Sequence, residues 1–232
     1  MKLVLYSGGQ LRSNHKLHQA VVSLARQSGS QKAANRKLTL TYIPFCHDNA
    51  SIFYHRAIRR FRANGVERFF CLHADQSPSK AEIKTAMESD IIYLAGGNTF
   101  YFLKHLRESG LLDHLRRFAK KGGVLAGLSA GALIMSPTTA LAADYGLGPD
   151  ENDVGLKDFK SMGLFPFEFS PHFHPKPKDI KAHLNYSKKT KYPVYGVEDG
   201  SGIVIDGKKM TVLGQATVFH RGKIVSETRT SE

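Results

Sequence analysis

A serine lies between two glycines at residues 127–131, in the sequence Gly-Leu-Ser-Ala-Gly. The apolar run 124–128 leads into this G-x-S-x-G pattern, and the helix-compatible residues 132–135 follow it. A nucleophile elbow requires small residues around the serine because the turn is tight, and its next backbone N–H points at the developing oxyanion. Glycine-rich structural turns also carry this pattern, but the strand and helix context favours Ser129 as a nucleophile.

A serine nucleophile needs a general base, and the base needs a group that orients it. The segment Ser-Pro-His-Phe-His at residues 170–174 offers His172 as the candidate base and His174 as its alternative. Further along, Glu198 and Asp199 lie in a turn that follows a strand-like run. Taken alone, each is more typical of an ordinary surface histidine or turn acid, so the interpretation depends on their combination.

Strand and helix patterns alternate through the first two thirds of the chain and must position these residues. Strands separated by helical stretches of about a dozen residues require right-handed crossovers, so we expect an α/β fold. Its central sheet is expected to be mostly parallel, with helices on both faces. The expected strands are residues 3–6, 38–44, 66–72, 90–95 and 124–128, and helices are expected to begin near Ser51, Ser79, Asn98 and Gly110.

The last third of the chain changes character, and antiparallel hairpins are expected from Val194 onward, near the C-terminus. Gly207 and the Arg221-Gly222 pair mark their turns. We find no internal repeat and no long linker, so residues 1–232 are expected to form one domain. The other expected elements are strands at residues 167–169 and 192–197 and a helix at residues 178–188.

Composition excludes several classes of protein. Of 232 residues, 41% are hydrophobic and 23% are charged, which argues against disorder, collagen and coiled coil. No apolar run reaches the ~18 residues of a membrane span, so we expect a cytoplasmic chain without membrane contact. Cys46 and Cys71 cannot build a disulfide framework, and Cys71 is expected to be buried as a small hydrophobe. Because the histidines are scattered, no metal and no cofactor are expected.

The chain is strongly basic, with 33 Lys and Arg against 20 Asp and Glu and a net charge of +13. Basic residues cluster at residues 56–62, 116–121 and 176–191. Such a field favours small acidic substrates or nucleic acid. Because the clusters are separate and lack interleaved aromatic residues, solvated helix faces are the more ordinary interpretation, and a nucleic-acid partner is not expected.

Three motifs occur in a fixed order: Ala-Gly-Gly-Asn-Thr-Phe at residues 95–100, the elbow with Ser-Pro-Thr at residues 136–138, and Ser-Pro-His-Phe at residues 170–173. Together they resemble the peptidase E, or aspartyl dipeptidase, family of serine peptidases, which is related to the cyanophycinases. This resemblance implies a fold like the class I glutamine amidotransferase domain, with serine replacing the amidotransferase cysteine. It also implies the order serine, histidine, acid, whereas α/β-hydrolases have serine, acid, histidine.

The resemblance assigns roles to individual residues. Ser129 matches the nucleophile and His172 the general base, while Gly97 and Ala130 match the oxyanion-hole positions. Asp199 falls where family members have a Glu, which shortens the reach to the imidazole by one methylene.

Two other acids stay open as candidates for the third member of the triad. Glu198 could supply the longer side chain after a local rearrangement. Asp144, fifteen residues after Ser129, matches an Asp of the family that binds substrate or assists the histidine. We rank Asp199 first.

The family resemblance implies dipeptides that begin with Asp as substrates, which require a cation for the side-chain carboxylate. Typical members have a Glu-Thr-Arg segment shortly after the catalytic histidine, whereas this chain has Pro-Lys-Pro-Lys-Asp-Ile-Lys at residues 175–181. Lysine attracts a carboxylate as a point charge, without the bidentate fork of arginine. We assign Asn98, Lys176 and Lys178 to substrate binding and expect a small acidic peptide as substrate.

Two hypotheses from different classes remain. In the first, the protein is a serine peptidase, a monomer or homodimer, that forms an acyl-enzyme at Ser129. In the second, it is a catalytically inactive or differently specific amidotransferase-like domain whose basic surface binds nucleic acid or another polyanion. The intact serine, base and oxyanion pair favours the first.

Overall fold

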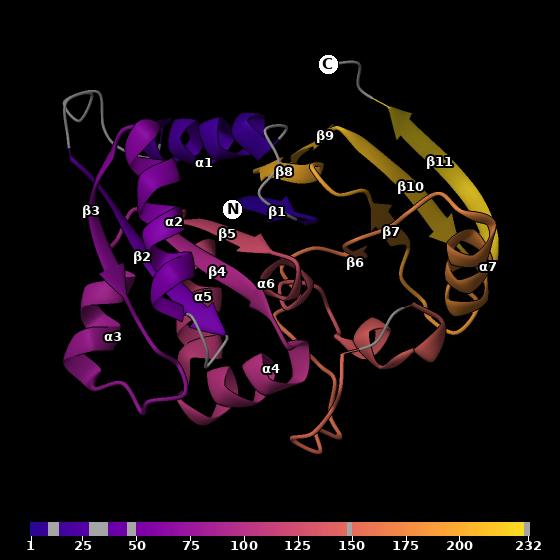
Figure 1. Ribbon diagram of the computed structural model, residues 1–232, viewed down its shortest axis with the longest axis horizontal. Coiled ribbons are helices and arrows are strands. Elements are labelled where there is room, and N and C mark those ends of the chain that lie inside the picture. The colour runs from indigo at the N-terminus through magenta and orange to yellow at the C-terminus, as the bar shows by residue number, and fades with distance from the viewer. Residues whose placement is uncertain (9–13, 28–36, 46–49, 148–149, 230–232) are drawn as a thin grey trace.

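The structure is a computed structural model that describes residues 1–8, 14–27, 37–45, 50–147 and 150–229. Two sheets form the framework of this part of the chain (Figure 1). The larger sheet has the strand order β3 (Val66–Cys71), β2 (Leu38–Phe45), β4 (Ile91–Gly97), β5 (Val124–Leu128), β1 (Lys2–Tyr6), β8 (Gly202–Asp206) and β9 (Lys209–Leu213). The smaller sheet has the order β11 (Lys223–Arg229), β10 (Gln215–His220), β7 (Val194–Val197) and β6 (Glu168–Ser170).

Strands β3, β2, β4, β5 and β1 run parallel to one another, as the alternating sequence pattern predicts. Helices α1 and α2 contact each other on one face, whereas α5 packs on β5 and contacts α3 and α4 on the other. The prediction of a mostly parallel sheet with helices on both faces is confirmed. The helices are α1 (His15–Gln27), α2 (Ala50–Ala63), α3 (Lys80–Met87), α4 (Thr99–Glu108), α5 (Leu111–Lys120), α6 (Ala130–Leu133) and α7 (Pro177–Tyr186).

Helices α3 and α4 begin at the capping residues that the sequence indicates. The Ser79 hydroxyl accepts from the backbone N–H of Glu82, and the Glu82 carboxylate accepts from the backbone N–H of Ser79 at 2.8 Å. Asn98 Oδ1 accepts from the first turn of α4. Each cap satisfies amide groups that have no partner inside their helix, and so fixes where that helix starts.

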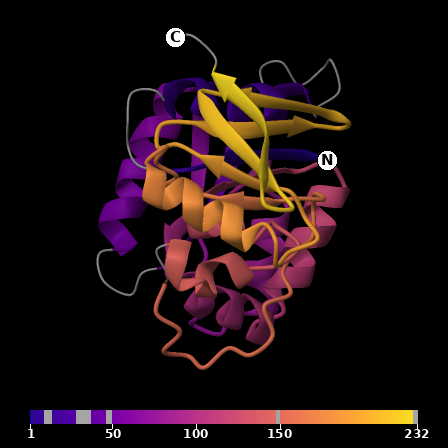
Figure 2. The same ribbon diagram turned by 90° about the vertical axis from the view of Figure 1, so that its right-hand side faces the viewer.

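The C-terminal hairpins form as expected, with turns at Gly207 and Arg221-Gly222, but they join different sheets. Strand β8 pairs antiparallel with β1 and extends the larger sheet, whereas β10 pairs antiparallel with β7. The smaller sheet and α7 lie at one end of the molecule, on the right in Figure 1 and facing the viewer in Figure 2. A second apolar core joins this end to α4 and α6, through Phe100, Leu133, Phe173, Val194 and Phe219.

This topology brings four segments to one edge of the larger sheet. The carboxyl ends of the parallel strands β1, β4 and β5 share this edge, and the amino end of the antiparallel β8 lies there too, with Gly202 opposite Tyr6. Backbone hydrogen bonds join the segments just beyond the strands, from Ser7 N to Ser201 O and from Ser129 N to Tyr6 O, both 3.0 Å long.

The strand expected at residues 66–72 forms as β3, but the prediction that Cys71 is buried was wrong. β3 lies at the edge of the sheet, so one flank has no neighbouring strand, and Phe70 is 43% exposed. Cys71 is half-buried rather than buried, and the partial burial raises the pKa of its thiol to about 11. Cys46 lies outside the described residues. No helix in the described part of the chain has the length and apolar character to cross a bilayer.

Candidate active site

Ser129 occupies the turn between β5 and α6 in a strained backbone conformation, with φ of 52° and ψ of −114°. The flanking glycines let strand and helix approach closely. A Cβ on Gly127 would lie 2.5 Å from the backbone of Gly131, and a Cβ on Gly131 would lie 2.5 Å from the carbonyl oxygen of Leu94. The predicted geometric need for small residues in this motif is therefore met in the structure.

A hydrogen-bonded chain connects Ser129 to an imidazole and a carboxylate. Ser129 Oγ lies 2.7 Å from His172 Nε2, and His172 Nδ1 lies 2.8 Å from Asp199 Oδ1. Because a carboxylate only accepts hydrogen bonds, Nδ1 carries the proton of the neutral ring, and Nε2 accepts from the serine hydroxyl. The arrangement can therefore remove a proton from Ser129.

The second apolar core anchors the loop that carries His172. The next residue, Phe173, is buried and stacks edge-on against Phe219, with ring centroids 5.6 Å apart. Its backbone N–H donates to the carbonyl oxygen of Val197 at 3.0 Å, which ties the loop to the end of β7. His183 of α7 packs on the same ring at 4.9 Å, and burial lowers the pKa of this histidine.

The other candidates for base and acid have different surroundings. His174 is exposed, and Glu198 lines a small cavity between α7 and the smaller sheet. Asp144 accepts hydrogen bonds from Lys189 Nζ at 2.8 Å and from the Gly146 N–H at 3.0 Å. Since Ser129 and Asp199 take both ring nitrogens of His172, the geometry favours Asp199 as its acid.

The two backbone positions matched to an oxyanion hole flank the serine. Ala130 is the first residue of α6, and Gly97 is the last residue of β4. A Cβ on Gly96 would lie 3.4 Å from Ser129 Cβ, so the end of β4 runs beside the serine. Gly97 has a φ of +157°, and a Cβ there would lie 2.9 Å from Phe45 Cβ, so this site requires glycine.

The residues assigned to substrate binding fall into two groups. The Asn98 side chain has a structural role, because its Oδ1 caps α4 and its Nδ2 donates to the carbonyl oxygen of Glu151 at 2.7 Å. This leaves one amide hydrogen of Asn98 for any further contact. Lys176 and Lys178 are exposed at the start of α7, a few residues after His172.

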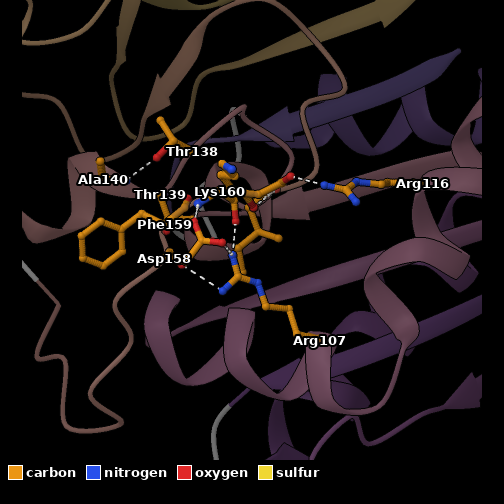
Figure 3. Close-up of polar contacts among 10 residues, drawn as sticks. Arg107, Arg116, Thr138, Thr139, Ala140, Asp158, Phe159 and Lys160 are labelled. Atoms are coloured by element: carbon orange, nitrogen blue, oxygen red, sulfur yellow. Dashed lines mark hydrogen bonds and ion pairs between the residues drawn. The ribbon is translucent and has the colours of Figure 1, made fainter.

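Two arginines, Arg107 and Arg116, form hydrogen bonds with the segment of residues 158–162, part of which Figure 3 shows. Arg107 of α4 donates to the carbonyl oxygens of Asp158 and Lys160 at 2.9 and 2.5 Å, and Arg116 of α5 donates to that of Met162 at 3.0 Å. The segment they hold returns to α6, where Met162 N–H donates to the Ile134 carbonyl oxygen at 3.0 Å. The sequence interpretation of residues 116–121 as a solvated cluster therefore missed the structural role of Arg116.

Ser7 is a further site residue that the sequence interpretation missed. It is completely buried, and its hydroxyl contacts both His172 and Asp199. The Ser-Gly-Gly sequence at residues 7–9 is typical of a turn after a strand and carries no sign of a catalytic role. A polar residue directly after a buried strand, at the edge where the other candidates lie, was the available signal.

The fold and the site together define an α/β protein in which hydrogen bonds join a serine, a histidine and an aspartate. The model of peptidase family S51 matches residues 3–213, and the chain belongs to this family of peptidases. A peptidase E from Salmonella arizonae is 29% identical over 237 residues, which cover 96% of this chain and 95% of the relative. One from Citrobacter koseri is 30% identical over 146 residues, which cover 59% of this chain and 61% of that protein.

Two solved structures share the fold. A Listeria monocytogenes protein assigned to peptidase E superposes with a TM-score of 0.66 and 25% identity, covering 91% of this chain and 96% of its own. A peptidase from an acI-B1 Actinobacterium has a TM-score of 0.71, covering 100% of this chain and 95% of its own. Its sequence identity is 15%, so this second likeness supports the fold alone.

Proposed function

We propose that the protein is a serine peptidase that hydrolyses small peptides through an acyl-enzyme. Ser129 is the nucleophile, His172 the general base and Asp199 the acid that orients the base. The observation that carries this proposal is the chain of two hydrogen bonds, 2.7 and 2.8 Å long, in a member of a peptidase family. The strained turn at Ser129 supports it, because such strain is typical of nucleophile elbows.

The mechanism follows from the positions of these atoms. As Ser129 Oγ attacks the scissile carbonyl carbon, His172 Nε2 takes its proton, and the carbonyl oxygen becomes negative. The backbone N–H groups of Gly97 and Ala130 hold this oxygen. His172 then protonates the leaving amine, which departs and leaves an acyl-serine that water hydrolyses with the same base. Asp199 stabilises the imidazolium and keeps its orientation throughout.

Replacing Gly97 by alanine tests the oxyanion position. We expect kcat to fall by about 100-fold, the scale of losing one oxyanion donor, because the new Cβ would collide with Phe45 and displace the amide. Steady-state kinetics with a dipeptide that the wild-type protein hydrolyses measure the loss. Gly207→Ala is the matched control, since Gly207 also has a positive φ but has no atom within 4 Å of an added Cβ. An unchanged kcat in Gly97→Ala would contradict the assignment of Gly97 to the oxyanion hole.

For the substrate, we propose dipeptides with an N-terminal Asp or another acidic residue. Similarity to peptidase E supports this preference, as does the positive charge of Lys176 and Lys178 shortly after His172. Because an ammonium group holds a carboxylate less precisely than a guanidinium does, we expect weak discrimination between Asp and Glu.

A dipeptide-library screen of the protein and its Ser129→Ala variant tests the reaction and the preference together. Charge reversal at Lys176 and Lys178 is expected to raise KM for an acidic dipeptide more than for a neutral one. Charge reversal at Lys120 and Lys121, which are exposed near the end of α5, is the matched control. Preference for basic or bulky apolar residues would overturn the substrate assignment, and loss of hydrolysis in EDTA would contradict the metal-independent mechanism.

A further inference from the structure

The hydroxyl of Ser7 lies at the junction of three segments of the site. Ser7 Oγ donates to the carbonyl oxygen of Val197 at 2.8 Å and lies 3.3 Å from Asp199 Oδ1. It also accepts from the backbone N–H of His172 at 2.7 Å. One buried hydroxyl therefore connects the end of β1 to the end of β7, to the acid and to the segment that carries the base.

The backbone of His172 needs such a partner. Its φ of +57° lies in the left-handed region, which a non-glycine residue keeps only where the surrounding structure holds it. The Ser7 hydroxyl accepts the N–H of this same residue. The following N–H, that of Phe173, donates to the carbonyl oxygen of Val197, which also accepts from Ser7. These bonds fix the direction in which the imidazole leaves the backbone.

Gly8 extends the contact between this turn and the site. A Cβ on Gly8 would lie 1.9 Å from Asp199 Oδ1 and 2.6 Å from His172 Cε1. The glycine backbone therefore lies directly against the paired carboxylate and imidazole, and leaves no room for a larger residue. Ser7 N–H donates to the Ser201 carbonyl oxygen at 3.0 Å, which ties the turn to the loop carrying the acid.

We propose that Ser7 is a positioning residue of this site. Its hydroxyl sets the His172 backbone and the Asp199 carboxylate relative to each other, so that Nδ1 meets Oδ1 and Nε2 meets Ser129 Oγ. Ser7 itself touches neither Ser129 nor the substrate in this mechanism. The inference rests on the proposed function, in which His172 and Asp199 activate Ser129.

Three variants test the inference. For each variant we would measure kcat and KM with the dipeptide that the library screen shows to be hydrolysed best, and the rate of labelling by a fluorophosphonate. We expect Ser7→Ala to lower kcat and labelling by about 100-fold with little change in KM, since displacing a catalytic group by about 1 Å costs that much. Ser7→Cys fills the same space but bonds weakly, so it is expected to show a similar loss. Ser89→Ala is the matched control, because its buried hydroxyl bonds Thr41 at 2.8 Å near the opposite edge of the sheet.

A double-mutant cycle separates positioning from a general structural effect. If Ser7 acts through the acid and the base, Ser7→Ala should slow labelling much less in an Asp199→Asn background than in the wild type. Equal losses in the two backgrounds would overturn the inference. The melting temperatures of all variants, measured alongside, show whether each one folds.

The outcomes distinguish this inference from the proposed function. Full activity in Ser129→Ala would overturn the proposed function itself. An inactive Ser129→Ala together with wild-type kcat in Ser7→Ala would overturn only the role of Ser7. Recovery of kcat in Ser7→Cys would show that Ser7 acts by packing, which also overturns the inference. If Ser7→Ala fails to fold, the similarly sized Ser7→Cys carries the test alone.

Discussion

The Ser129→Ala variant is expected to lose about six orders of magnitude in kcat, the scale observed when a nucleophile that acts as a unit with its base is removed. Alanine has no oxygen to attack the carbonyl carbon or to form an acyl-enzyme. The fold should survive, because the smaller side chain fits the same strained turn. Steady-state kinetics and fluorophosphonate labelling, followed by mass spectrometry, measure the loss and locate the label.

His172→Ala should be almost as inactive, because the proton of Ser129 then has no acceptor. His174→Ala is the matched control, since this histidine lies two residues away and is exposed. A His174 variant as inactive as the His172 variant would undo the assignment of the base. Labelling at a residue other than Ser129 would undo that of the nucleophile.

Asp199→Asn is expected to lower kcat by about 10⁴-fold with little effect on stability, the scale of the same change in another serine peptidase. An amide can donate to Nδ1, which favours the tautomer with its proton on Nε2. That proton would point at Ser129 Oγ, and the ring could no longer accept the hydroxyl hydrogen. Kinetics of the purified variant measure the effect.

Two further substitutions decide between the candidate acids. Glu198→Gln and Asp144→Asn are expected to cost much less than Asp199→Asn, because neither side chain occupies a ring nitrogen of His172. A larger loss in Glu198→Gln would transfer the role to Glu198. A larger loss in Asp144→Asn would transfer it to Asp144, whose carboxylate bonds Lys189.

The sequence could predict those features that depend on neighbouring residues. The elbow at Ser129 follows from an apolar strand and two glycines within a few positions, and the cap of α4 follows from a single Asn98. The parallel direction of the strands follows from their separation by helices. These patterns are local, so they can be seen before any tertiary contact is known.

The missed features depend on contacts between distant parts of the chain. Ser7 lies 165 residues from His172 and 192 from Asp199 along the chain, so nothing near it indicates its partners. Arg116 belongs to a basic cluster by sequence, and only the return of residues 158–162 to α5 turns it toward backbone carbonyls. The partial exposure of Cys71 likewise depends on the place of β3 as an outer strand of the sheet, which composition does not reveal.

Strand β1 pairs with both β5 and β8, and this pairing determines when the parts of the site can come together during synthesis. Chains fold during synthesis from the N-terminus, so the parallel strands and Ser129 leave the ribosome well before residues 172–199. A nascent chain at that stage holds a serine with neither base nor acid, and the flank of β1 that β8 will cover is still unpaired. In the proposed function, Ser129 can therefore attack a substrate only after residues 172–199 have been synthesised and have folded against it.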